Sequence, residues 1–408
     1  MTKRILVVCD GPVPHARMNY RGEPLVAYLG VATDYEVDVV CPRPDAPLPL
    51  RHPRIRYHYI APYKRVKSFS GAVSRAADIA RLARVVHKIA VRRKVHCVRS
   101  ISSIPTAAAL LARRGRGFPV VANLSDFYTD LYASSNLPLK RGVGAAIQKV
   151  NTFAARADGV IVDSKEQRDA WVEAGVDPSR CYSLPHGIPR TLLLSPHAPV
   201  EDGGPHIPIL PAPMLLYVGD ISQLDGVDLL FRAIAKLRSQ GITLSCLILG
   251  QGSDAYKAEL SRLSQKLDLA KEIVHVPSVP NRALPELMSR ADVLVAPFRL
   301  TATTTTAIPN KLLEYLSTDR PIVITATPTL RRTVGSAVAF VAPEDVEGLA
   351  AALRGCVEEP STRGGDLSVR RSLRERLSWV SIMEVERAII DGFAEGRPPD
   401  PADIDFRW

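Results

Sequence analysis

The chain has 408 residues, 46% of them hydrophobic and 23% charged, which is enough for two or three domains with buried cores and too apolar for intrinsic disorder. No run of 18 apolar residues occurs, so we expect no membrane-spanning helix, and the chain should stay in the cytoplasm. The six cysteines are scattered singly, which argues against a disulfide framework or a zinc site and predicts buried, reduced thiols.

Short apolar runs alternate with helix-period stretches, the pattern of βαβ units and parallel sheets. In the first half, strands are predicted at 4–9, 36–41, 95–99, 119–124, 159–162 and 181–184. Helices are predicted at 23–29, 73–91, 104–113, 143–156 and 165–174. These elements predict one doubly wound domain.

Residues 195–213 contain six prolines and two glycines, which predicts an interdomain linker. A second alternation follows, with strands predicted at 214–218, 244–249, 273–276, 293–296, 321–325 and 338–341 and helices at 227–240, 254–267, 284–289, 310–316 and 346–356. In the first of these helices, Val227, Leu230, Ile234 and Leu237 form a core-facing stripe.

The predicted fold class is therefore α/β, with two doubly wound Rossmann-like domains facing each other across a cleft. The predicted division is an N-terminal domain (1–194), the linker (195–213), a second domain (214–376), a final helix (377–394) and a tail (395–408).

The basic charge is concentrated in one segment, because residues 51–100 hold 14 Lys and Arg against a single acid, Asp78. Apolar side chains at Ile79, Leu82, Val86 and Ile89 share one helical stripe. The roughly opposite face carries Arg81, Arg84, Lys88 and Arg92. This face is either simply solvated or docks on an anionic membrane, where each basic side chain contributes about 1 kcal/mol. We expect this face to dock on a membrane. We expect no nucleic acid as a partner, because no nucleic-acid motif accompanies the basic charge.

The second half carries a specific series of segments: Leu216-Tyr-Val-Gly219, Leu247-Ile-Leu-Gly-Gln-Gly252, Ala291-Asp-Val-Leu-Val-Ala-Pro297 and Ile308-Pro-Asn-Lys-Leu-Leu-Glu-Tyr-Leu316. In order and spacing they closely resemble the nucleotide-sugar half of GT-B glycosyltransferases, particularly the retaining family 4 group. The resemblance implies that the domain at 1–194 binds the acceptor, that the domain at 214–376 binds the nucleotide sugar, and that the helix at 377–394 crosses back to the N-terminal domain. It also implies transfer of a sugar from a UDP- or GDP-linked donor, with no other cofactor. The implied acceptor is lipid-linked or a saccharide, in surface polysaccharide or glycolipid synthesis on the inner face of the cell membrane.

A donor site is predicted where Pro309 and Asn310 open a helix whose free N–H groups suit an anion, with Lys311 in the first turn as a diphosphate clamp. By resemblance, Glu314 would hydrogen-bond the ribose hydroxyls. The same site is expected to include Gly219, Asp220, Gly250, Gln251, Gly252 and Thr306.

Three positions depart from the family pattern. Thr306 replaces a glutamate, Asp220 replaces an arginine and Asp225 replaces a lysine. Lys311, threonine hydroxyls, backbone N–H groups and Arg17 or Arg21 must therefore neutralise the diphosphate.

In the N-terminal domain, Asp126 follows a predicted strand and could orient or deprotonate the acceptor hydroxyl, although it could equally cap a turn. His186, where relatives often carry Asn, is expected to line the acceptor cleft. The predicted catalytic residues are thus Asp126, Lys311 and Glu314. No Asp-x-Asp motif ends a predicted strand, so we expect no metal requirement. A sugar-nucleotide epimerase of the same fold and a non-catalytic scaffold remain alternatives.

Overall fold

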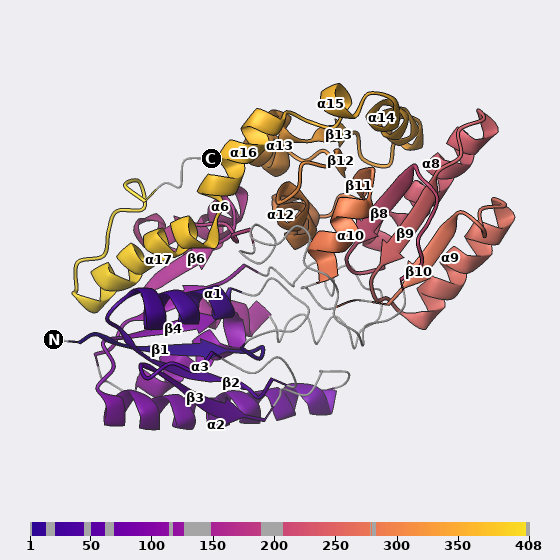
Figure 1. Ribbon diagram of the computed structural model, residues 1–408. Helices are drawn as coiled ribbons and strands as arrows, with labels where there is room; N and C mark the ends of the chain where they lie inside the picture. The colour runs from indigo at the N-terminus through magenta and orange to yellow at the C-terminus, as the bar shows by residue number, and fades with distance from the viewer. Residues whose placement is uncertain are drawn as a thin grey trace. The chain divides into compact units, whose positions relative to one another are not determined.

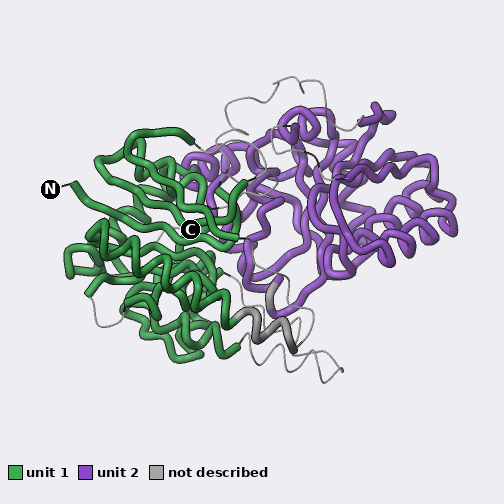
Figure 2. Tube along the Cα trace, turned by 90° about the horizontal axis from the view of Figure 1, so that it is seen from below, with its two compact units in different colours: residues 1–185, 379–407 green, residues 186–378, 408 purple. Residues whose placement is uncertain are grey.

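The computed structural model describes residues 2–13, 21–44, 50–61, 69–113, 117–125, 148–188, 207–277, 279 and 283–404. The chain forms two compact units (Figure 2). Unit 1 comprises residues 1–185 and 379–407, and unit 2 comprises residues 186–378.

Unit 1 is built on a parallel sheet in the order β3-β2-β1-β4-β5-β6-β7. Its strands are β1 (Arg4–Cys9), β2 (Glu36–Pro42), β3 (Ile55–Ile60), β4 (Cys97–Ile101), β5 (Val120–Asn123), β6 (Gly159–Val162) and β7 (Cys181–Ser183). Its helices are α1 (Gly22–Ala27), a π-helical turn (Tyr28–Ala32), α2 (Phe69–Arg93), α3 (Ser103–Arg113), α6 (Lys165–Glu173) and α17 (Trp379–Ala394).

Alternate residues of β1 enter two different cores, one on each face of this sheet. Leu6 and Val8 pack with α2 and α3, whereas Ile5 and Val7 pack with α1 and α17. Figure 1 shows α1 and α17 on one side of the sheet and α2 on the other. Helix α17 follows unit 2 in the chain but completes the core of unit 1.

Unit 2 is built on a parallel sheet in the order β10-β9-β8-β11-β12-β13. Its strands are β8 (Met214–Val218), β9 (Ser245–Leu249), β10 (Ile273–Val276), β11 (Val293–Ala296), β12 (Ile322–Thr325) and β13 (Ala339–Val341). Its helices are α8 (Val227–Ser239), α9 (Asp254–Lys266), α10 (Leu284–Arg290), α11 (Ala302–Thr306), α12 (Asn310–Leu316), α13 (Pro328–Val334), α14 (Val346–Glu358), α15 (Pro360–Arg363) and α16 (Leu367–Arg376).

The predicted class of two Rossmann-like α/β sheets is confirmed. The predicted apolar stripes of α2 and α8 are buried, and all six cysteines are free and buried. The prediction missed β3, an edge strand in which Arg56 and Tyr59 are exposed and the apolar signal is interrupted. It also missed α16, whose fully buried Arg370 donates to four backbone carbonyls in place of an apolar anchor.

Candidate active site

The sheet order of unit 2 defines where a ligand can bind. The connections from β8 and from β11 leave in opposite directions, so these adjacent strands form the topological switch point. In open α/β sheets, ligands bind outside the carboxyl ends of the strands at this point. Gly219 directly follows β8, and Pro297 directly follows β11. The segments that begin at these two residues therefore border the candidate site.

Lys311, in the first turn of α12, reaches the end of β8. Its ammonium donates to the Tyr217 hydroxyl at 2.7 Å and pairs with the Asp225 carboxylate at 2.9 Å. It also lies 4.4 Å from the centre of the Tyr217 ring, a cation–π contact. The Lys311 side chain is 12% exposed.

Gly219 leaves room for this lysine. Its φ of +142° is unfavourable for other residues, and a β-carbon there would lie 2.8 Å from Cε of Lys311. The end of the Lys311 side chain thus occupies the space that a side chain at position 219 would fill.

Asp225 is held by two elements at once. Its second carboxylate oxygen accepts from the Ser222 backbone N–H at 3.2 Å and from the Ser222 hydroxyl at 2.6 Å, which closes a capping box. The acid that replaces the family lysine is therefore the direct counter-ion of Lys311.

Glu314 lies one turn beyond Lys311 on the same helix and is 8% exposed. Burial raises the pKa of its carboxyl to about 7, and the nearby Lys311 charge opposes only part of this rise. The next residue fixes the helix, because the Tyr315 hydroxyl accepts from the Val218 N–H at 2.8 Å and donates to the Val295 carbonyl at 3.3 Å. One tyrosine thus ties α12 to both strands of the switch point.

The glycines after β9 have a structural explanation. A β-carbon at Gly250 would collide with the carbonyl oxygen of Gly219, and one at Gly252 would collide with that of Ile221. Ile221 donates to the Gln251 carbonyl at 2.8 Å and bridges to Gly252, so the two chains stay paired beyond their strands. Their predicted contact with a donor stays a prediction.

The remaining predicted donor residues occupy different surroundings. Asp220 is exposed, and its carbonyl accepts from the Tyr217 hydroxyl at 2.5 Å. Burial keeps the pKa of that hydroxyl well above its usual value, so it remains a donor. The Thr306 hydroxyl bonds back to the Ala302 carbonyl at 3.2 Å within α11. Pro309 precedes α12 in an extended conformation, as a helix-opening residue should.

His186 belongs to unit 2 and not to the N-terminal unit in which its cleft role was predicted. Its Nδ1 lies 3.2 Å from the Asn310 side-chain oxygen, at the start of α12. The structure therefore places His186 next to the predicted donor helix.

Sequence reasoning missed Arg299, which organises the loop after β11. Its guanidinium pairs with both carboxylate oxygens of Asp228 at 2.8 and 2.7 Å, donates to the Gln223 carbonyl at 2.7 Å and pairs with Glu344 at 3.0 Å. It thereby braces the turn that contains Asp225. Its only sequence signal was its position two residues after Pro297.

Arg21 was predicted to face a ligand, and the structure corrects this. The side chain is fully buried in unit 1, where it pairs with Glu386 of α17 at 2.7 Å and donates to the carbonyls of Leu184 and Pro185 at 2.7 and 2.8 Å. Its guanidinium therefore has no exposed surface for a diphosphate. The predicted roles of Arg17 and Asp126 lie outside the described residues.

The basic face of α2 is exposed as its spacing predicted. Arg81, Arg84, Lys88 and Arg92 all reach solvent, and of the four only Arg81 has an acidic partner among the described residues, Asp78 at 3.6 Å. Within the described residues, no helix has the length and apolar character needed to span a bilayer.

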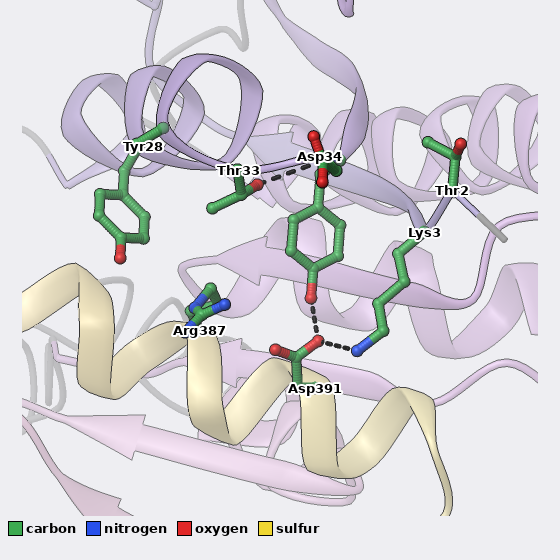
Figure 3. Close-up of a pocket in the computed structure, with 9 residues that line it drawn as sticks. Thr2, Lys3, Tyr28, Thr33, Asp34, Arg387 and Asp391 are labelled. Carbon is green, nitrogen blue, oxygen red and sulfur yellow. Dashed lines mark hydrogen bonds and ion pairs between the residues drawn. The ribbon is translucent and has the colours of Figure 1, made fainter.

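Unit 1 contains a pocket of about 460 Å³ (Figure 3). Lys3 and Tyr35, which precede β1 and β2, line it and both donate to Asp391 of α17. The pocket therefore sits at the amino ends of the strands, opposite the end where α/β sheets bind ligands. Across the described part of the chain, no group of three or more His, Cys, Asp or Glu side chains is placed to hold a metal ion.

Two Rossmann-like units in one chain are the architecture of the GT-B class, to which many glycosyltransferases belong. Residues 24–187 match the family described as "Glycosyl transferase 4-like domain", and residues 212–359 match "Glycosyl transferases group 1". Together these two matches cover most of the chain. The chain therefore belongs to the group 1, 4-like family of glycosyl transferases and is a glycosyltransferase.

Individual relatives agree with this assignment. A D-inositol 3-phosphate glycosyltransferase of Catenulispora acidiphila is 24% identical over 307 residues, 71% of each chain. Sucrose-phosphate synthase from Thermosynechococcus elongatus has a TM-score of 0.72 at 18% identity, covering 96% of this chain and 100% of that one. Anabaena HepE in complex with UDP-glucose has a TM-score of 0.62 at 15% identity, covering 96% and 98%. The two structural likenesses show the shared fold.

Proposed function

We propose that this glycosyltransferase takes its sugar from a UDP- or GDP-linked donor bound in unit 2. The observation that carries the proposal is the placement of Lys311 against Gly219 at the switch point, with Glu314 one turn further along α12. The UDP-glucose complex of Anabaena HepE, which has the same fold, supports a nucleotide sugar as the donor.

In this proposal the bond between the sugar and the β-phosphate breaks while an acceptor oxygen bonds to the sugar and loses its proton. The departing diphosphate gains negative charge, which the Lys311 ammonium and the N–H groups at the start of α12 stabilise. Glu314 holds a ribose hydroxyl by hydrogen bonding. We propose retention of configuration and no metal requirement, with Lys311 supplying the cationic charge.

The acceptor in this proposal is a lipid-linked or saccharide hydroxyl, in the synthesis of a surface polysaccharide or glycolipid. The exposed basic face of α2 supports docking on the anionic inner face of the cell membrane, where such an acceptor would be found. Asp126 is our candidate for activating the acceptor hydroxyl.

A transfer assay tests the proposal. Thermal shift with UDP-, GDP-, ADP- and CMP-sugars selects the donor, since a ligand at 100 times its dissociation constant adds about 2.7 kcal/mol of stability. The labelled donor is then incubated with membrane lipid extract, and transfer, hydrolysis and epimerisation are measured separately. Labelled lipid product is the expected result, and an epimerised sugar nucleotide with no transfer would contradict the proposal.

A further inference from the structure

The cation of the donor site already has a carboxylate partner. Lys311 pairs with Asp225 at 2.9 Å, and the Lys311 and Asp225 side chains are only 12% and 18% exposed. An anion that binds the Lys311 ammonium is therefore repelled by the Asp225 carboxylate that is paired with it. At such distances and in partly buried surroundings, this repulsion is poorly screened.

Asp225 keeps two hydrogen bonds when it releases Lys311. Ser222 supplies a backbone N–H and a hydroxyl to its other oxygen, at 3.2 and 2.6 Å. Lys311 can likewise leave, because it is a compact charge on a flexible stem. Exchange of one anion for another at Lys311 thus needs no rearrangement of the turn.

We propose that Asp225 is a built-in competitor of the diphosphate for Lys311, which weakens binding of the nucleoside diphosphate product more than binding of the donor. This inference rests on the proposed function. Cleavage of the bond between sugar and β-phosphate leaves the product with one more negative charge than the donor. Repulsion from Asp225 scales with that charge, so Asp225 favours product release.

The test measures binding of UDP and UDP-glucose, and of GDP and GDP-mannose, by calorimetry. Asp225→Asn should bind the nucleoside diphosphate roughly tenfold more tightly, an effect of about 1.4 kcal/mol, with a smaller gain for the sugar nucleotide. In steady-state kinetics, the inhibition constant of the nucleoside diphosphate product should fall by a larger factor than the KM for the donor. In a Lys311→Met background the gain from Asp225→Asn should shrink, because the competed cation is gone.

Asp268→Asn is the matched control. Asp268 forms an exposed ion pair with Arg238 at 2.7 Å in the same unit, and asparagine tolerates its φ of +55°. This variant should bind like the wild type.

Different outcomes overturn different claims. Equal or weaker binding by folded Asp225→Asn, or the same gain with Lys311→Met, overturns the competition while leaving the proposed donor site intact. Failure of the wild type and of every variant to bind any of the four nucleotides overturns the proposed function, and the inference with it.

Discussion

Burial of Glu314 predicts that the stability of this enzyme falls as the pH rises through neutrality. Its carboxyl lies on α12 with 8% of the residue exposed, and burial raises its pKa from 4.5 to about 7. In the unfolded chain the same carboxyl titrates near its ordinary value. The folded state therefore binds the proton more tightly than the unfolded state between these two values.

The sign and size follow from linkage. The stability that the protonated carboxyl contributes is fully present below about pH 4.5 and is lost as the pH rises through about 7. At 1.36 kcal/mol per pKa unit, a shift of this size corresponds to about 3 kcal/mol between pH 4.5 and pH 8. Glu314→Gln keeps the neutral shape at all pH values, so it should be up to about 3 kcal/mol more stable than the wild type at pH 8 and within about 1 kcal/mol of it at pH 5.

Urea unfolding followed by far-UV circular dichroism at several pH values measures this difference. Glu259→Gln is the control, since Glu259 is exposed on α9 of the same unit. The control should follow the wild-type pH profile. If Glu314→Gln also parallels the wild type from pH 5 to pH 8, the buried carboxyl is ionised at no such cost, and the reasoning fails.

The remaining predictions concern the chemistry, the membrane and the core of unit 1. Lys311→Ala should lower kcat/KM by roughly 10²-fold or more, and Lys311→Arg should recover only part of it; near wild-type turnover by folded Lys311→Ala would remove α12 from the mechanism. Joint replacement of the four basic residues of α2 by Gln should reduce sedimentation with anionic liposomes and leave donor affinity unchanged, whereas unchanged sedimentation would contradict membrane docking. Activity should survive excess EDTA; loss that Mn²⁺ restores would show the donor site to be misread. Glu386→Gln should lower the free energy of unfolding by about 3–5 kcal/mol, because the guanidinium groups of Arg21 and Arg99 lose their buried carboxylate partner. Unfolding is measured by the fluorescence of Trp171 and Trp379, and a loss below about 1 kcal/mol would refute this prediction.

Periodicity made the central strands of both sheets and most of the helices predictable, although α11, α13, α15 and α16 were missed. Val227, Leu230, Ile234 and Leu237 could be assigned to a core face because burial of an apolar stripe requires only local spacing. The edge strand β3 was not predicted, because Arg56 and His58 interrupt the alternation of apolar and polar residues that identifies a strand.

Roles that depend on partners distant in the chain could not be predicted in the same way. Arg21 has the charge and position of a ligand-binding residue, yet its partner Glu386 is 365 residues away. Asp225 was recognised as a departure from the family pattern, but only the folded chain shows that it pairs with Lys311. Spacing reveals which residue types are present, whereas three-dimensional pairing decides which charges remain available.

The electrostatics of the proposed donor site follow from these pairings. Lys311 is balanced by Asp225, and the raised pKa of Glu314 leaves a good fraction of that carboxyl uncharged near neutral pH. Lys311 and Asp225 together therefore carry no net charge, unlike the two cations of the family pattern. A paired lysine still stabilises charge that develops on a diphosphate lying closer to it than to its partner, but less strongly than a lone lysine would. Such an arrangement exchanges some transition-state stabilisation for weaker retention of the nucleoside diphosphate, and product release is the step that limits many enzymes once chemistry is fast.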